Sequence, residues 1–396
     1  MPQTDDERKI LWIWLKDIFK FSDVKVFSLV EIFGSAENIY KADSNDFKNI
    51  KGLLQKEINM LCAKDLSRAQ KTYENALKSG TDIILMQEDR YPYLLKQIYQ
   101  PPPVLYVKGN IECVKDRLVI AGVGTRKCDD MSAKIMTNIA CDLAKAGIVI
   151  VSGMAKGIDS AAHRGALAAG GITAAVLGTA IDKIYPAENR ELYYNITESG
   201  GAVISEHPPG YYGFKSDFVR RNRIIAGLSH GVLVCRAPVA SGSLTTARAA
   251  LDFGRDTFCV PGDATAENEG SNRLIMDGCA KMILSAKDII EEYAQSGVYY
   301  NFSPEKIKEQ EIKKLQPLDD KADKIQIFEK NKEEGKYEAL DENQRKVVMY
   351  VKDKRILSED ICQALGMDAK VLSAMITELE IDDILTNDNG YISLNI

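Results

Sequence analysis

The sequence lacks the features that mark a membrane protein, a secreted protein or a protein stabilised by metal. No apolar run approaches the roughly 18 residues that a membrane-spanning helix needs. The eight cysteines are scattered without a CxxC pair, and there are only three histidines, so neither a structural zinc site nor a disulfide framework is expected. The chain starts with acidic residues before a short apolar run, unlike a signal peptide. We therefore expect a cytoplasmic protein with no membrane contact and no bound metal.

Two common nucleotide-binding signatures are absent as well. There is no GxxxxGK[ST] segment, which argues against a P-loop ATPase. The segment from Gly122 to Arg126 begins like the dinucleotide fingerprint GxGxxG, but Lys127 stands at the third glycine position, and no acidic residue ends the next apolar run. No nucleophile, base and orienting residue stand together at a catalytic spacing. The residues therefore give no sign of a nucleotide cofactor or of a catalytic centre.

Charge is distributed unevenly along the 396 residues. The net charge is −6, which taken alone disfavours a nucleic-acid partner. Between Gly201 and Ala250, however, there are six basic residues and only two acidic ones. The acidic excess lies in the flanking parts of the chain, so a local basic site in the middle is compatible with the overall charge.

Composition and periodicity divide the chain into five regions. At roughly 100–200 residues per domain, the length alone predicts about two to four domains. Residues 1–80 show helical periodicity with glycines at the helix ends, and 81–116 form a connector with short strands and a proline break. Residues 117–295 alternate short apolar runs with helical segments, which predicts an α/β fold with a doubly wound, Rossmann-like parallel sheet. The composition of residues 296–337 predicts a charged linker. The pattern of residues 338–396 predicts three helices followed by a hairpin, which is the order of elements in a winged helix.

Several turns that follow the predicted strands are rich in glycine and small hydroxyl residues. In an open parallel sheet, ligands bind beyond the carboxyl ends of the strands, where backbone N–H groups can hold phosphate oxygens. One such turn could reflect only the steric need for glycine. Four of them on one edge predict a polyanion or nucleotide site. The candidate binding residues are Gly124, Thr125, Arg126, Ser152, Gly153, Lys156, Ser241, Gly242 and Ser243.

The segment from Phe214 to Leu228 combines positive charge with aromatic rings. Arginine side chains match phosphates, and exposed rings offer a surface on which unpaired bases can stack. On a helix, Arg220 and Arg223 share a face, whereas Arg221 points elsewhere. The further candidates for nucleic-acid contact are Lys215, Phe218, Arg220, Arg221 and Arg223.

A structural interpretation of the same residues remains open. Some of the arginines could be buried partners of Asp182 or Glu206, and Phe214 or Phe218 could belong to the core. A buried, hydrogen-bonded role is favoured for His163, because no nucleophile or metal partner stands near it in sequence. Asp159 is a candidate acid or base, but capping its helix or bracing Lys156 is favoured.

The predicted recognition helix of the winged helix, Ala369 to Glu380, is acidic. It carries Lys370 against Glu378 and Glu380, and further aspartates follow it. A helix that reads duplex DNA should be basic where it meets the phosphates. The charge therefore favours a protein contact or a regulatory surface here.

The ordered motifs from about Tyr91 to Lys281 resemble the DprA/Smf family, the DNA-processing proteins of bacterial natural transformation. They include YPYLL, PPPVLYVKG, GVGTR, VSGMAKGIDSAAHRGAL, GGAVISEHPPG, FVRRNRIIAGLS, SGSLTTARAAL and VPG. The resemblance implies a homodimeric, non-enzymatic recombination mediator without a cofactor, which binds and protects single-stranded DNA and recruits the RecA recombinase. It also implies an N-terminal domain of the SAM or helix-hairpin-helix kind and a terminal winged helix. The DNA contacts that it implies are Arg126, Lys215 and Phe218, with Arg220, Arg221 and Arg223 in the same patch and the SGM and SGS turns lining the pocket.

Two departures and two other functions have to be weighed against this resemblance. Arg236 stands where the family usually has an acidic residue, and His230 where Asp is common, so either could alter the pocket. The sheet also resembles that of nucleotide phosphoribohydrolases, but Arg248 stands where their catalytic glutamate belongs, which removes the obvious acid or base. The acidic winged helix could in addition make the chain an adaptor for proteins.

Overall fold

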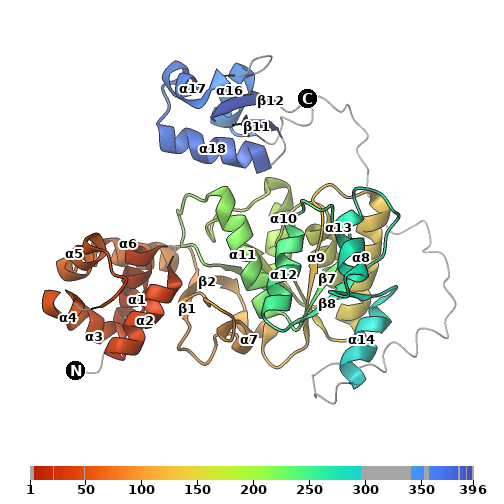
Figure 1. Cartoon of the computed structure of the whole chain (residues 1–396), viewed down its shortest axis with the longest axis horizontal. Helices are drawn as coiled ribbons and strands as arrows, with labels where there is room; N and C mark the ends of the chain where they lie inside the picture. Colours follow the sequence, from red (N-terminus) through yellow and green to blue (C-terminus); the bar gives the residue numbers. More distant parts are fainter. Residues whose placement is uncertain are drawn as a thin grey trace.

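The computed structural model of the chain describes residues 4–20, 22–48, 50–295, 340–351, 356–381, 384–388 and 390–394 (Figure 1). They form an N-terminal module of helices, a central α/β module and a small C-terminal module of helices and strands. The linker predicted at 296–337 lies outside these residues. Within the described ranges, every helix is too short or too polar to cross a bilayer.

Six helices make up the N-terminal module: α1 (Asp5–Phe19), α2 (Asp23–Phe33), α3 (Ala36–Lys41), α4 (Ser44–Lys48), α5 (Gln55–Ala63) and α6 (Ser67–Lys78). The first helix begins at a capping box, because the Thr4 side chain accepts the Glu7 N–H and the Glu7 side chain accepts the Thr4 N–H, both at 3.2 Å. The inner faces of these helices share one hydrophobic core with Tyr106 and Val203 of the central module. The N-terminal module is therefore packed onto the edge region of the central sheet.

The central sheet has nine strands: β1 (Asp82–Leu85), β2 (Val104–Gly109), β3 (Val119–Val123), β4 (Val149–Ser152), β5 (Thr173–Leu177), β6 (Ala202–Ser205), β7 (Gly231–Val234), β8 (Asp256–Cys259) and β9 (Lys281–Met282). Their spatial order is β1-β2-β6-β5-β4-β3-β7-β8-β9. Strands β3 to β9 are parallel, and β1 and β2 are added antiparallel beside β6. The predicted α/β class with a mainly parallel sheet is confirmed.

Helices cover both faces of this sheet, which explains why its strands are continuous apolar runs. Helices α7 (Tyr93–Lys96), α11 (Lys215–Leu228) and α12 (Ser243–Asp252) pack on one face, and α8 (Asp130–Lys145), α9 (Ile158–Ala168) and α14 (Ala286–Gln295) on the other. The remaining helical segments are η1 (Ile111–Val114), η2 (Ala187–Asn189), α10 (Arg190–Glu198) and α13 (Glu269–Met276).

The point where the strand order reverses lies at β3. From β3 the chain proceeds to β4, β5 and β6 on one side, and β7, β8 and β9 follow on the other side. The loops that leave β3 and β7 therefore diverge, and such a switch point leaves a crevice beyond the carboxyl ends of the strands.

The C-terminal module consists of α16 (Glu342–Val351), β10 (Ile356–Leu357), α17 (Ser358–Leu365), α18 (Ala369–Ile381), β11 (Leu385–Asp388) and β12 (Tyr391–Leu394). The three strands pair antiparallel in the order β10-β12-β11. The module has its own core, which includes Val347, Ile361, Leu372 and Ile392. Asn389, which together with Gly390 is the turn that the sequence predicts for the hairpin, lies outside the described residues.

Candidate nucleic-acid interface

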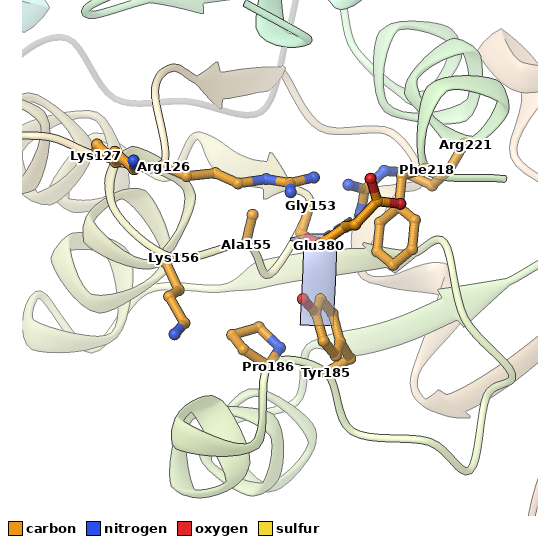
Figure 2. A pocket seen from close by; sticks show the side chains of 10 residues that line it. All are labelled: Arg126, Lys127, Gly153, Ala155, Lys156, Tyr185, Pro186, Phe218, Arg221 and Glu380. Atoms are coloured by element: carbon orange, nitrogen blue, oxygen red, sulfur yellow. Dashed lines mark hydrogen bonds between the residues drawn. The ribbon is translucent and has the colours of Figure 1, made fainter. Parts of the chain in front are cut away.

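Two adjoining cavities open beyond the carboxyl ends of the central strands. One has a volume of about 300 Å³ and the other about 550 Å³, and Arg126, Phe218 and Arg221 line both. Figure 2 shows the residues that line the smaller one. We call the two together the switch-point crevice. Its lining residues are Val123, Gly124, Thr125, Arg126, Lys127, Gly153, Ala155, Lys156, Asp159, Tyr185, Pro186, Lys215, Phe218, Val219, Arg221, Asn222, Ile225, Pro238, Ala240, Ser241, Gly242, Ser243, Thr246, Glu267 and Glu380.

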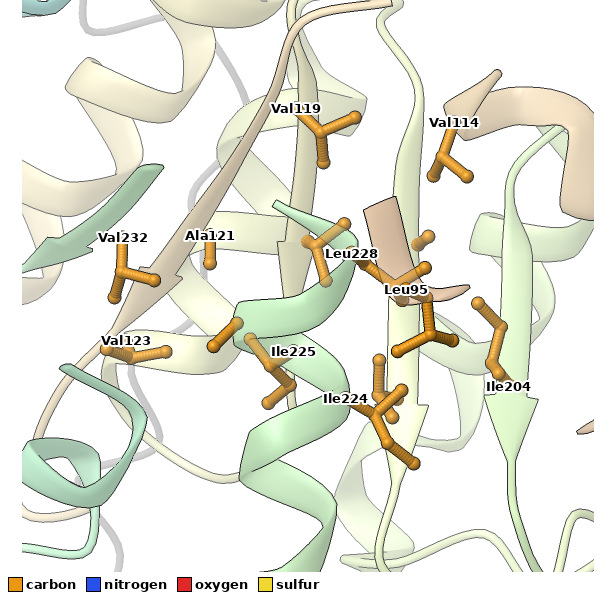
Figure 3. Close-up of a cluster of buried hydrophobic side chains, with 14 of the residues drawn as sticks. Leu95, Val114, Val119, Ala121, Val123, Ile204, Ile224, Ile225, Leu228 and Val232 are labelled. Carbon is orange, nitrogen blue, oxygen red and sulfur yellow. The ribbon is translucent and has the colours of Figure 1, made fainter. Parts of the chain in front are cut away.

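Helix α11 supplies the side chains at the centre of the crevice, and its apolar face fixes its position. Ile224, Ile225 and Leu228 are buried against β3 and its neighbours, where they meet residues such as Val119 and Val232 (Figure 3). Each fully buried aliphatic side chain of this kind contributes about 1.5–3 kcal/mol. The polar residues of the first turns of α11 are thereby held in place at the crevice.

Arg126 is an exposed cation on the loop that follows β3. The loop lies directly against the backbone before α9, because Gly157 has φ of +76° and a Cβ there would lie 2.5 Å from the Thr125 carbonyl oxygen and 2.6 Å from that of Arg126. Gly124 is needed for a similar reason, since a Cβ there would come within 2.6 Å of the Ile158 side chain. The glycines of the two turns therefore position the arginine.

Phe218 forms an aromatic wall of the crevice. Its ring is half-buried and contacts the Tyr185 ring edge-on, with 5.5 Å between centroids and 66° between planes. The guanidinium carbon of Arg126 lies 5.8 Å from the ring centroid, within reach of a cation–π interaction. Gly178 allows this placement, because a Cβ there would lie 2.9 Å from the ring. A ring held beside a cation is an arrangement on which an unpaired base can stack.

Arg221 is buried at the floor of the crevice. Its Nη1 donates hydrogen bonds to the carbonyl oxygens of Gly153, at 2.7 Å, and of Val176, and so ties together the ends of β4 and β5. Burial lowers the pKa of Arg221 to about 10, while the nearby Asp159 carboxylate acts in the opposite direction. Gly153 leaves the space for this contact, because a Cβ there would collide with Arg221. This arginine is structural and at the same time lines the site.

Arg220 and Arg223 correct the expectation of an exposed arginine surface. Arg220 Nη2 donates to Asp23 Oδ2 at 2.7 Å, and Arg223 Nη2 donates to Glu206 Oε2 at 2.7 Å. Their side chains are only 19% and 13% exposed. Of the two carboxylates considered from the sequence, Glu206 is the partner, whereas Asp182 accepts the Gly210 N–H.

These two arginines belong to a buried ionic network, made up of Lys16, Asp23, Glu206, Arg220 and Arg223. Lys16 and Asp23 come from the N-terminal module, and the others come from the central module. Burial alone would raise the pKa of Glu206, but the surrounding cations outweigh it and hold that pKa at about 2. The network therefore joins the N-terminal module to helix α11.

The serine-containing turns divide into one that lines the crevice and one that does not. Ser241, Gly242 and Ser243 line it, and Ser241 Oγ lies 2.7 Å from Ser243 Oγ where α12 begins. Ser152, in contrast, is fully buried and donates to the Gly122 carbonyl oxygen at 2.6 Å. The N–H groups of Ser243, Leu244 and Thr245 donate within this turn, so what the turn presents to the crevice is chiefly its hydroxyl groups. Ser152 instead holds β4 to β3.

Two lysines predicted for the site lie on its rim. Lys215 begins α11, and its side chain is 67% exposed. Lys156 follows β4, and its Nζ lies 3.0 Å from Glu188 Oε1. Both side chains line a cavity of the crevice and add positive charge to it.

Sequence reasoning missed Tyr185 and Asn222. Tyr185 stands in the YP pair before η2, and only its contact with Phe218 places it in the site. Asn222 Nδ2 donates to Gly242 O at 3.1 Å and to Thr245 Oγ1 at 2.8 Å, which links α11 to the turn before α12. An asparagine between arginines in the sequence gives no signal of that link.

The remaining polar candidates have structural roles. His163 is completely buried, its Nδ1 lies 2.7 Å from Thr173 Oγ1, and burial lowers its pKa to about 3, which agrees with the favoured structural interpretation. Asp159 accepts the Gly153 N–H at 3.1 Å, and burial raises the pKa of its carboxyl group.

The two departures from the family pattern lie outside the crevice lining. Arg236 pairs with Asp129 and donates to Ser132 Oγ at 3.2 Å, at the start of α8. His230 Nδ1 accepts the Val119 N–H at 3.1 Å, at the amino ends of β3 and β7, and burial lowers its pKa to about 4. The second contact lies at the opposite end of the strands from the crevice.

The geometry of the crevice suits a phosphate-bearing, unstacked ligand. Its rim carries cations, its wall carries an aromatic ring, and the turn before α12 adds the hydroxyl groups of Ser241 and Ser243. Within the described ranges, no cluster of three or more His, Cys, Asp or Glu side chains could hold a metal ion.

Comparisons with known proteins agree with one another. A family model described as DNA recombination-mediator protein A matches residues 82–294. The DNA processing protein DprA of Streptococcus pneumoniae is 43% identical over 207 residues, which are 52% of this chain and 72% of that protein. The DNA processing protein DprA of Bacillus subtilis is 38% identical over 223 residues, which are 56% of this chain and 75% of that protein.

Solved structures show the same similarity. The X-ray structure of DprA from Streptococcus pneumoniae aligns with a TM-score of 0.62 and 34% identity, and the alignment covers 74% of this chain and 99% of that one. A structure that addresses the single-stranded DNA binding mode of DprA from Helicobacter pylori aligns with a TM-score of 0.50 and 29% identity, over 55% of this chain and 96% of that one.

Proposed function

The chain belongs to the DNA recombination-mediator protein A family, and we propose that it is a single-stranded DNA-binding recombination mediator of natural transformation. Its relatives are named as DNA-processing proteins, and single-stranded DNA binding is described for the relative from Helicobacter pylori. The observation in this chain that supports the proposal best is the switch-point crevice, where the exposed cation Arg126 stands beside the ring of Phe218.

In this proposal the strand is held mainly through its backbone. Phosphates meet Arg126, Lys215 and the hydroxyl groups of Ser241 and Ser243, and a base stacks at Phe218. Phosphate neutralisation and stacking do not depend on the identity of the base, so binding is expected to tolerate any sequence.

We further propose that the protein protects incoming strands in the cytoplasm, forms a homodimer and helps to load the RecA recombinase. In the C-terminal module, the order of three helices and three strands is that of a winged helix, and we propose that fold for it.

We propose that the protein is not an enzyme. The competing phosphoribohydrolase function needs a carboxylate at the position of Arg248, which is an exposed arginine on α12. Release of free base from AMP or cytidine monophosphate above the blank would contradict this part of the proposal.

The test of DNA binding is Arg126→Ala, measured with labelled oligo-dT by fluorescence anisotropy at several salt concentrations. Loss of one phosphate contact should weaken binding about tenfold and reduce the slope of log K against log salt by about one. Arg164→Ala is the matched control, because Arg164 is exposed on α9 and outside the crevice lining. If Arg126→Ala and Arg164→Ala bind alike, the crevice is not the DNA site.

A further inference from the structure

The C-terminal end of helix α18 lies on the rim of the switch-point crevice. In Figure 1 the C-terminal module lies beside α11, and its helix α18 contacts α11. Glu380 of α18 lines both cavities of the crevice, and in Figure 2 its side chain lies among those of Arg126, Phe218 and Arg221. A carboxylate from another module thus shares the cavity with the cations of the candidate DNA site.

Two ion pairs hold this helix end at the crevice. Glu378 pairs with Lys183, which lies two residues before Tyr185 of the crevice wall. Glu380 Oε1 lies 3.9 Å from Nζ of Lys215, the first residue of α11. The end of α18 is therefore paired with two separate segments beside the crevice, the one before Tyr185 and the start of α11.

The two carboxylates stand where they do not stabilise their own helix. They occupy the last turn of α18, where the helix dipole favours cations, and that turn contains no basic residue. Their orientation is nevertheless fixed within the module, because Glu378 accepts a hydrogen bond from Gln344 Nε2 at 2.8 Å and Glu380 accepts the Asn387 N–H at 3.0 Å. The module therefore holds both carboxylates in fixed orientations, Glu380 in the crevice and Glu378 beside it.

We propose that the C-terminal end of α18 is an intramolecular ligand of the switch-point crevice. The Glu380 carboxylate occupies a position at which a phosphate of a single strand would bind, since carboxylates and phosphates are recognised by the same lysine and arginine groups. Glu378 anchors the helix end beside the crevice through Lys183. DNA then has to displace α18 before it can use the whole crevice. This inference rests on the proposed function, because it assigns a competitor to the same site. It also gives the acidic helix of the C-terminal module a partner within its own chain.

The expected effect follows from competition. If α18 covers the crevice about nine-tenths of the time, the apparent affinity for DNA is about tenfold lower than the intrinsic one. Partly exposed ion pairs are individually weak, but a contact within one chain benefits from an effective concentration in the millimolar range. Weak ion pairs and a high effective concentration together favour a helix α18 that occupies the crevice in the absence of DNA and leaves it when DNA binds.

The test is the full chain with Glu378→Gln and Glu380→Gln together. Glutamine keeps an oxygen that can accept the hydrogen bonds from Gln344 and Asn387, and it removes only the charge. The matched control, Glu359→Gln with Asp360→Asn, removes two exposed charges from α17 of the same module. The glutamine pair should bind oligo-dT about tenfold more tightly with a steeper salt dependence, since more counterions leave the uncovered crevice. The control should bind like the unmodified chain.

A second measurement detects the contact between α18 and the central module directly. A water-soluble carbodiimide should join Lys183 to Glu378 in the unmodified chain, and mass spectrometry of the digest should show less of that cross-linked peptide when oligo-dT is present. Absence of the cross-link, or equal oligo-dT affinity of all three proteins, would overturn the inference and leave the proposed function standing. If none of the proteins binds oligo-dT, the proposed function fails and the competition fails with it, even where the cross-link forms.

Discussion

Removing the charge of Glu206 tests the ionic network between the N-terminal module and α11. The buried carboxylate lies 2.7 Å from Arg223 Nη2, 3.4 Å from Arg220 Nε and 3.9 Å from Lys16 Nζ. Burial opposes ionisation, but these cations outweigh it and move the pKa of Glu206 from 4.5 to about 2. At about 1.4 kcal/mol per pKa unit, the ionised carboxylate contributes about 3 kcal/mol to folding at neutral pH.

Glu206→Gln should therefore lower the free energy of unfolding by about 3 kcal/mol, because it removes one of the two carboxylates that neutralise Lys16, Arg220 and Arg223. Urea denaturation followed by tryptophan fluorescence is a direct assay, since both tryptophans, Trp12 and Trp14, are buried in α1 of the N-terminal module. The matched control is Glu188→Gln. It removes an exposed pair with Lys156, which should change the free energy by less than about 1 kcal/mol.

The loss of stability caused by Glu206→Gln should depend on pH. The folded-state pKa of Glu206 is lower than its ordinary value, so its stabilising contribution is complete above pH 4.5 and is lost as the pH falls towards 2. The difference in unfolding free energy between the unmodified chain and Glu206→Gln should shrink to roughly half near pH 3. Equal stability of the two proteins at pH 7, or a difference that does not change on acidification, would refute the reasoning.

Two further substitutions address the crevice itself. Phe218→Ala should weaken binding of labelled oligo-dT about tenfold or more, because stacking of one base on an aromatic ring is worth about 1–3 kcal/mol; unchanged anisotropy titrations would exclude the ring from the site. Gly157→Ala places a Cβ 2.5 Å from the Thr125 carbonyl oxygen at a φ of +76°, so it should displace the Arg126 loop, destabilise the fold by about 1 kcal/mol or more and weaken oligo-dT binding. Urea denaturation and the same titration would show this, and a variant that matches the unmodified chain in both would contradict the role assigned to this glycine.

The central sheet could be predicted because its signal is local. Each parallel strand is an apolar run that helices cover on both sides, and such runs are visible without any knowledge of their partners. The antiparallel addition of β1 and β2 could not be predicted in the same way. Strand β2 pairs with β6, and that choice depends on contacts across almost a hundred residues of sequence.

The gathering of turns at one edge also followed from the sequence. The carboxyl ends of parallel strands meet at the same edge, so Arg126, Gly153 and Ser241 were expected to lie together, and they line one crevice. Ser152 was expected there too, but it is the last residue of a strand whose side chains are all buried.

The arginines show what a single sequence cannot reveal. Asp23 lies 197 positions from Arg220, on a helix of a different module, and nothing in the local pattern links the two. A cluster of arginines beside aromatic residues resembles a nucleic-acid surface in the sequence, because acidic partners from distant parts of the chain are not visible in the local pattern. The packing of α1 and α2 against the central module brings Asp23 to Arg220 and Arg223, and only this packing shows that they are paired whereas Arg126 is exposed.

The hydrophobic core that the N-terminal helices share with the sheet edge bears on how the protein can be divided. A fragment that starts after α6 would lose α1, which contacts β1 and β2, and would expose to water part of the apolar cluster that includes Tyr106. The smallest unit expected to fold autonomously is therefore the helices and the sheet together. Deletion of the first 80 residues should therefore destabilise the central sheet, so a change in DNA binding of that variant would not show a separate role of the N-terminal helices.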